Sequence, residues 1–214
     1  YTLSLHDALP ISLREDLPPG TFVVVDQFID RTFAREKSFF GTGLVAHVSM
    51  AHPVCGRLGK HLLQAGKTAG ISIVDGGTYL VMEGPQFSSL AESELYRTWN
   101  CDVIGMTNMP EAKLAREAEL CYASVAMVTD FDCWHPNHDA VTVDAIVKVL
   151  LANADNASSL VKTVAPKLQA DTSAYQCACR IALQFAIITA PEARDAAMVQ
   201  RLNAVAGRVL TPQT

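Results

Sequence analysis

Two aspartates stand one residue apart in the stretch TDFDCW, directly after the apolar run CYASVAMV (121–128). Side chains at positions i and i+2 of a strand point to the same face, so Asp130 and Asp132 would lie together, opposite Phe131. Two close carboxylates raise the pKa of one of them, which suits a proton donor or a group that hydrogen-bonds a ligand. A strand that has simply reached the surface, with Asp130 capping a turn, is the alternative at this point.

Two further segments place polar and aromatic side chains where an apolar run gives way to a helical pattern. They are EGPQFSS (83–89) and GMTNMPE (105–111). Ligands of α/β proteins bind at the carboxyl ends of strands, so three such segments together indicate a binding site. Each segment taken alone is as well explained by helix capping.

The elements that must position these residues alternate in type. Ser89 and Glu92 have the spacing of a capping box at the start of a helix. The alternation predicts an α/β fold with helices packed on a largely parallel or mixed sheet. Strands are expected at 21–28, 44–50, 71–84 (two strands separated by a Gly-Gly break), 101–107 and 121–130, and helices at 53–70, 88–100, 110–120, 141–168 and twice in the tail.

Composition is typical of a globular domain with a sizeable core, since half of the 214 residues are hydrophobic and 18% are charged. The net charge is −5 and no lysine or arginine run exists, which argues against a nucleic-acid partner. No run of 18 apolar residues occurs, so no membrane partner is expected and a cytoplasmic location is predicted.

The six cysteines lie mostly inside apolar segments and include no CxxC motif, so we interpret them as buried thiols in a reducing cytosol. Cys133, His135, His138 and Asp139 offer metal-binding side chains close together in the sequence. The HPNH stretch would break a regular helix, however, and the spacing matches no established zinc motif. No metal site is therefore predicted.

The three segments together make the chain recognisable. The run from Gly76 to Trp134, with EGPQFSS, GMTNMPE and TDFDCW, closely resembles S-methyl-5′-thioadenosine phosphorylases of the trimeric purine nucleoside phosphorylase family. SLRED, VDQFIDRT and HVSMAHPVC resemble the same family, and the resemblance extends from Ser12 to about Leu168. It implies a three-layer phosphorylase/hydrolase-like fold with a central mixed sheet flanked by helices, and phosphorolysis of S-methyl-5′-thioadenosine to adenine and 5-methylthioribose 1-phosphate.

The resemblance implies a role for the aspartate pair. Family members cleave the bond between purine N9 and ribose with phosphate as the nucleophile, and the purine leaves with negative charge. Asp130 matches the position that hydrogen-bonds or protonates N7 and accepts from the 6-amino group, and Asp132 would assist on the same edge. Relatives that act on 6-oxopurines usually have asparagine at the first position.

Other positions follow from the resemblance one at a time. Phe87 matches the aromatic that packs against the base, Met106 the methionine under the ribose, and Thr107 the threonine that binds phosphate. Val143 and Ile146 match apolar positions near the methylthio group, although their spacing equally suits the core of a helix. The expected ligands are methylthioadenosine and phosphate, with no further cofactor.

His47 matches a histidine that reaches the 5′ end of the substrate in a neighbouring subunit. The resemblance therefore implies a homotrimer with sites at the interfaces between subunits. It places residues 1–11 outside the family domain as a leader, and assigns 12–214 to one nucleoside phosphorylase domain with a helical tail from about 171.

The family's chain begins well before SLRED, and this chain matches none of that front part. The front carries the first strands of the sheet, a Gly-rich loop and an Arg-His pair that binds phosphate. We therefore expect a fold truncated at its N-terminus and an impaired phosphate site. Three alternatives stay open: a 6-oxopurine nucleoside phosphorylase, a non-catalytic fragment that retains only subunit association, and a nucleosidase that uses water in place of phosphate.

Overall fold

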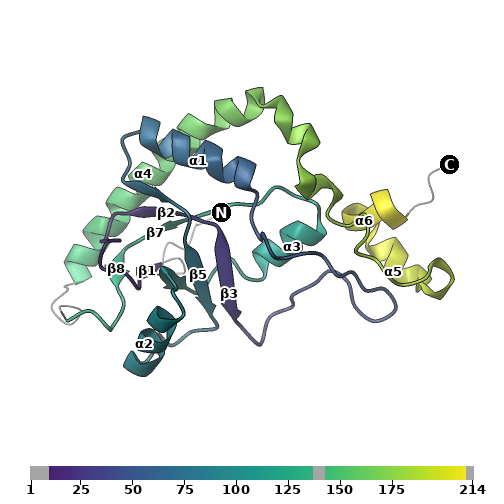
Figure 1. Ribbon diagram of the computed structural model, residues 1–214, viewed down its shortest axis with the longest axis horizontal. Helices are drawn as coiled ribbons and strands as arrows, with labels where there is room; N and C mark the ends of the chain where they lie inside the picture. The colour runs from purple at the N-terminus through teal and green to yellow at the C-terminus, as the bar shows by residue number, and fades with distance from the viewer. Residues whose placement is uncertain (1–9, 137–142, 211–214) are drawn as a thin grey trace.

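The strands form two mixed sheets in the computed structural model, which describes residues 10–136 and 143–210 (Figure 1). The larger sheet has the order β3 (Gln27–Arg31), β5 (Thr78–Met82), β6 (Val103–Gly105), β1 (Ile11–Ser12) and β8 (Asp130–Phe131). The smaller sheet has the order β4 (Ile73–Asp75), β2 (Phe22–Val25) and β7 (Ser124–Met127). The predicted α/β class with a mixed sheet is confirmed.

Each strand of the smaller sheet continues, after one or two residues, into a strand of the larger sheet. The chain changes sheets at Asp26, at Gly76–Gly77 and at Val128–Thr129. The first two changes are tied together, because the N–H of Gly77 donates to the carboxylate of Asp26 over 3.0 Å. Gly76 adopts a φ of +80°, a conformation that favours glycine. The strands predicted at 21–28 and 121–130 are therefore each two strands, whereas the Gly-Gly break is confirmed.

Helices cover both sheets (Figure 1). Helix α1 (Gly56–Thr68) lies beside the long helix α4 (Val143–Ala170), and both pack on the smaller sheet. Phe22 of β2 is fully buried there among Leu160, Val164 and other apolar side chains. Helix α2 (Leu90–Thr98) packs on the larger sheet through Tyr96, and α3 (Glu111–Glu117) follows β6. No described helix is long and apolar enough to cross a membrane.

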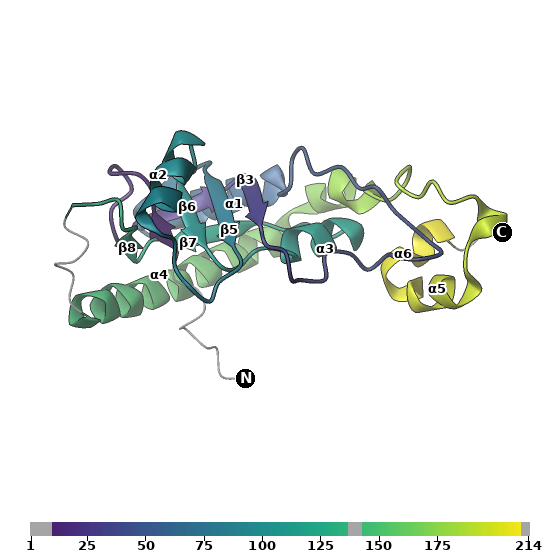
Figure 2. The same cartoon turned by 90° about the horizontal axis from the view of Figure 1, so that it is seen from below.

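The tail after α4 forms a lobe at one end of the elongated molecule (Figure 2). It begins with 3₁₀ turns at Thr172–Gln176, Ala178–Ile181 and Pro191–Ala193 and ends with α5 (Ala196–Arg201) and α6 (Asn203–Leu210). Regular helix is thus confirmed only for its last part. The strand predicted at 44–50 is wrong: the segment has isolated bridges only, and its Leu44 is buried against Leu183 and Leu202 of the tail. Burial in this lobe accounts for the apolar run.

The capping box at the start of α2 is formed as the sequence predicts. The hydroxyl of Ser89 accepts from the N–H of Glu92, and the Glu92 carboxylate accepts from the N–H of Ser89 over 2.8 Å. These bonds satisfy two backbone donors that a helix start otherwise leaves without partners.

We expect Ser89→Ala to lower the free energy of unfolding by about 1 kcal/mol, because it removes this cap. Ser88→Ala is the matched control, since the buried Ser88 hydroxyl has no hydrogen-bond partner within the described segments. Urea unfolding followed by circular dichroism measures both. Equal midpoints for the two variants would contradict the assignment of the cap.

Candidate functional site

The site lies along one edge of the larger sheet. Strands β5 and β6 run parallel, so their carboxyl ends, which lead into Glu83 and Met106, meet at this edge. Strand β8 runs in the opposite direction, because β1 pairs antiparallel with β6 and parallel with β8. The amino end of β8, at Asp130, therefore lies at the same edge as the carboxyl ends of β5 and β6, with β1 between β6 and β8. The three segments singled out in the sequence do converge, but Asp130 begins a strand instead of ending one.

Two adjacent cavities open at this edge. The larger, of about 540 Å³, contains Phe87, Met106 and Thr107 in its lining. The smaller, of about 250 Å³, contains Asp130, Asp132 and Ile146. Ile11 and Phe87 line both, so the two cavities are neighbours. Together they have the volume of a site for a drug-sized or nucleoside-sized ligand.

The two aspartates share one cavity, as their spacing predicts. Asp132 is buried, and its Oδ2 has no hydrogen-bond partner in the part of the chain that the structure describes. Its backbone N–H donates to the carbonyl of Ser12 over 3.0 Å, which fixes the carboxylate beside β1. Asp130 is half-buried and its Oδ1 accepts from the N–H of Phe131 over 2.8 Å. A buried acceptor without a partner is costly unless a ligand satisfies it.

The larger cavity combines an aromatic surface with a hydroxyl group. The Phe87 side chain is 64% exposed, although it is large and apolar, so it offers a free face. The hydroxyl of Thr107 lies 3.3 Å from the phenol oxygen of Tyr79. Burial raises the pKa of Tyr79, so this phenol stays protonated at neutral pH. When the Tyr79 phenol donates to the Thr107 oxygen, the Thr107 hydroxyl can donate a hydrogen bond to an anion.

Met106 is held against the backbone of the preceding loop. Gly84 has a φ of +73°, and a Cβ atom there would lie 2.5 Å from the sulfur of Met106. Only glycine permits this contact without a shift. The close approach fixes the thioether at the mouth of the larger cavity.

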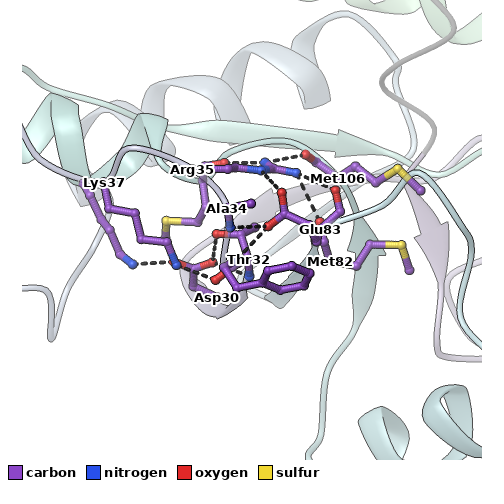
Figure 3. Close-up of polar contacts among 11 residues, drawn as sticks. Asp30, Thr32, Ala34, Arg35, Lys37, Met82, Glu83 and Met106 are labelled. Carbon is purple, nitrogen blue, oxygen red and sulfur yellow. Dashed lines mark hydrogen bonds and ion pairs between the residues drawn. The ribbon is translucent and has the colours of Figure 1, made fainter.

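Arg35, which the sequence patterns did not single out, joins the ends of the two strands through residues that line this cavity (Figure 3). Its Nη1 donates to the carbonyls of Met106 over 2.8 Å and Met109 over 2.6 Å. Its Nη2 donates to the carbonyls of Met82 over 3.3 Å and Glu83 over 3.0 Å, and its Nε donates to the Glu83 carboxylate over 3.4 Å. All five guanidinium N–H groups therefore have acceptors.

The Glu83 carboxylate completes this arrangement. It accepts from the backbone N–H groups of Phe33 over 2.6 Å and Ala34 over 3.3 Å, and the Phe33 bond leads in lowering the Glu83 pKa. The loop that carries Arg35 is thus tied to the end of β5 in two ways, by the backbone N–H groups of Phe33 and Ala34 and by the Arg35 side chain. No local spacing signals such a contact, since Arg35 and Met106 are 71 residues apart in sequence.

Residues at the start of the described chain also belong to this edge. The carbonyl of Pro10 accepts from the N–H of Thr129 over 3.0 Å, and the indole of Trp134 donates to the carbonyl of Ser12 over 3.1 Å. Ile11 lines both cavities. Residues 10 and 11 fall within the leader that the family resemblance implies, where no strand is expected, yet Ile11 belongs to β1 of the larger sheet.

The remaining predicted residues are placed as follows. Ile146 lies with the aspartates in the smaller cavity, while exposed His47 lines neither cavity. Val143 begins α4, but its side chain lies outside the described part of the chain. His138 and Asp139 also lie outside the described residues, so the group Cys133, His135, His138 and Asp139 stays untested.

Known proteins match this chain over most of its length. The family model described as the phosphorylase superfamily matches residues 12–166. The S-methyl-5′-thioadenosine phosphorylase of Rhodospirillum rubrum is 64% identical over 199 residues, which cover 93% of this chain and 68% of the relative. The enzyme of the same name from Bradyrhizobium diazoefficiens is 62% identical over the same shares.

Solved structures agree with the sequence comparison. A methylthioadenosine phosphorylase from an antarctic soil metagenomic library has a TM-score of 0.87 and 45% identity, covering 92% of this chain and 69% of that one. A methylthioadenosine phosphorylase from Schistosoma mansoni, solved in complex with adenine, has a TM-score of 0.79 and 32% identity, covering 85% and 71%. The chain therefore belongs to the phosphorylase superfamily and, within it, to the S-methyl-5′-thioadenosine phosphorylase family.

Proposed function

We propose that this chain catalyses phosphorolysis of S-methyl-5′-thioadenosine to adenine and 5-methylthioribose 1-phosphate, as a pentosyltransferase of the purine nucleoside phosphorylase type. The observation that carries the proposal is the pair of adjacent cavities, with carboxylates in one, the Thr107 hydroxyl in the other, and Phe87 common to both. Relatives named for this activity, at up to 64% identity, support it.

The smaller cavity suits the adenine. In the reaction, the bond between C1′ and N9 breaks, a phosphate oxygen bonds to C1′, and the purine takes up a proton at N7. A carboxylate accepts from a 6-amino group, and a carboxylic acid donates to N7, so Asp130 fits this edge. Asp132, whose Oδ2 has no partner among the described residues, supplies a second acceptor. Phe87 then packs against the base.

The larger cavity suits the ribose and phosphate, with Met106 under the sugar and Thr107 at the anion. Its lining within the described residues contains no lysine or arginine. Arg35 contacts residues that line it, but its five N–H groups are directed at protein acceptors. Phosphate is a dianion that binds best to several charged or backbone donors. We therefore expect weak phosphate binding by this chain. Val143 and Ile146 keep the position near the methylthio group that the family resemblance implies, and Ile146 lines the adjacent smaller cavity.

We further propose that the chain assembles with copies of itself as a homotrimer, with His47 reaching a neighbouring site. Support comes from large exposed apolar side chains. Phe185 is 90% exposed and Ile188 72% on the tail segment that pairs with Ala46 and His47, and Phe33 is 83% exposed on the loop that carries Arg35. Exposed apolar surface of this kind marks interfaces between proteins. Light scattering after gel filtration measures the state, and a monomer at micromolar concentration would contradict it.

Release of adenine from methylthioadenosine should depend on phosphate. We expect adenine and 5-methylthioribose 1-phosphate in equal amounts, with a rate that still rises at high phosphate because few groups bind the anion. Chromatography of both products with and without phosphate decides. Equal adenine release in both conditions would indicate a nucleosidase, and no release at any phosphate concentration would leave only association between subunits as a function.

Asp130→Asn should lower kcat/KM for methylthioadenosine about 100-fold, because the amide no longer delivers a proton to N7. Its NH₂ group donates to a 6-oxo group, so the activity with 6-oxopurine nucleosides should rise relative to the parent. Asp144→Asn is the matched control, as Asp144 is exposed on α4. A parent chain that prefers hypoxanthine nucleosides would instead support a 6-oxopurine phosphorylase.

Arg35→Gln should lower the free energy of unfolding by about 2 kcal/mol, because strand-end carbonyls lose charged donors. It should also lower kcat/KM, since Met106 and Glu83 shift together. Arg35→Lys should recover only part of both losses, because an ammonium group has no planar fork. Urea unfolding and steady-state kinetics measure them, with Arg201→Gln, exposed on α5, as the control. Full recovery by lysine would contradict the positioning role.

A further inference from the structure

Four cysteine thiols come together outside the two cavities. Cys55 is the N-cap residue of α1, Cys121 lies between α3 and β7, and Cys177 and Cys179 belong to the start of the tail. Their four sulfur atoms all lie within 4.8 Å of one another. Three distant parts of the sequence supply these thiols, so no local spacing motif predicts that they come together.

The distances between the sulfurs suit a shared metal ion. Cys177 Sγ lies 3.6 Å from Cys55 Sγ and 3.6 Å from Cys121 Sγ. A disulfide needs about 2.05 Å between sulfurs. Four thiolates around zinc at about 2.3 Å in a tetrahedron have sulfurs about 3.8 Å apart. The observed separations are thus far from a disulfide and close to the edge of that tetrahedron.

Two arginines lie against the same sulfurs. Arg57 Nη2 is 3.6 Å from Cys121 Sγ, and Arg116 Nη1 is 3.7 Å from Cys179 Sγ. Arg57 also forms an ion pair with Asp171 over 2.5 Å, which orients its guanidinium group. Four thiolates around a divalent cation leave a net charge of −2, and two guanidinium groups that donate to the sulfurs offset it. Both arginines are only partly buried, and neutral thiols would attract their guanidinium groups far less than thiolates would.

The surroundings of the thiols are compatible with such a site. Cys55 and Cys179 are buried, whereas Cys121 and Cys177 are partly buried. A metal ion bound here would remove the proton from each thiol on coordination.

We propose that Cys55, Cys121, Cys177 and Cys179 bind one zinc ion as a closed tetrahedral thiolate site. Four protein ligands leave no open position, so the ion has a structural role instead of a catalytic one. Cys121 and Cys177 are only partly buried, which leaves a path by which the ion enters. The four ligands favour zinc, because soft thiolates bind zinc in preference to magnesium or calcium.

The consequence for the fold is a cross-link between the sheets and the tail. The start of α1, the end of α3 and the segment after α4 meet at this point (Figure 1). The ion would therefore fasten the lobe formed by α5 and α6 to the part of the molecule that carries the candidate site. Metal removal should loosen the tail first and lower the melting temperature of the chain.

The test uses the full chain, purified with a reductant that does not bind metal, incubated with ZnSO₄ and then freed of excess ion. We expect about one zinc per chain by mass spectrometry of the metal, as for other four-cysteine sites. Cobalt in place of zinc should give the intense visible absorption of tetrahedral thiolate coordination. Alkylation with a maleimide followed by peptide mapping should find those four cysteines protected and Cys101 and Cys133 unaffected by zinc.

Cys177→Ser should weaken zinc binding at least ~10-fold, while Cys101→Ser, a change at a buried cysteine outside the cluster, should leave it unchanged. If Cys177→Ser fails to fold, the protection pattern of the parent chain still decides. The proposal is overturned by substoichiometric zinc in the reduced chain, by bound zinc that leaves the four thiols reactive, or by disulfides among them that persist under reductant.

Discussion

A single guanidinium group holds together the ends of two parallel strands, and the candidate site depends on it. Arg35 donates to four carbonyls and one carboxylate that come together where these strands end. Carbonyls at the carboxyl end of a sheet need such a partner because the ladder has ended. The same contacts set where Met106 and Glu83 leave the sheet, and hence where the larger cavity opens. The Arg35 guanidinium group therefore positions the strand ends, and phosphate must be bound by other donors.

The division of strands between two sheets explains how the rest of the edge is arranged. Because β2, β4 and β7 each pass into the second sheet, their continuations β3, β5 and β8 have fixed positions relative to one another. Strand β8 then presents Asp130 and Asp132 beside the ends of β5 and β6, although it runs in the opposite direction. Polar residues from separate parts of the sequence, such as Thr107 and Asp130, thus share two adjoining cavities.

Sequence patterns predicted the features that depend on neighbours along the chain. The spacing of Asp130 and Asp132, the Ser89–Glu92 cap and the break at Gly76–Gly77 are all local, and the structure has all three. Patterns missed what depends on distant partners. The apolar run at 44–50 suggested a strand but packs against the tail through Leu44, Ala46 and Val48. Neither Arg35 nor the cysteine group has a sequence spacing that indicates its contacts. The roles of Phe87, Met106 and Thr107 came from resemblance to a family and not from periodicity.

Strand β1 has only two residues, yet it lies between β6 and β8 and supplies the carbonyls that anchor the aspartate segment. The N–H of Thr129 donates to the carbonyl of Pro10, directly before β1, and the N–H of Asp132 donates to the carbonyl of Ser12, the last residue of β1. A short strand opens at low free-energy cost, and the groups bonded to it open with it. The amide protons of these two residues should then exchange with solvent as one cooperative unit, faster than those of the longer strand β5. Order around the smaller cavity thereby depends on a strand of only two residues.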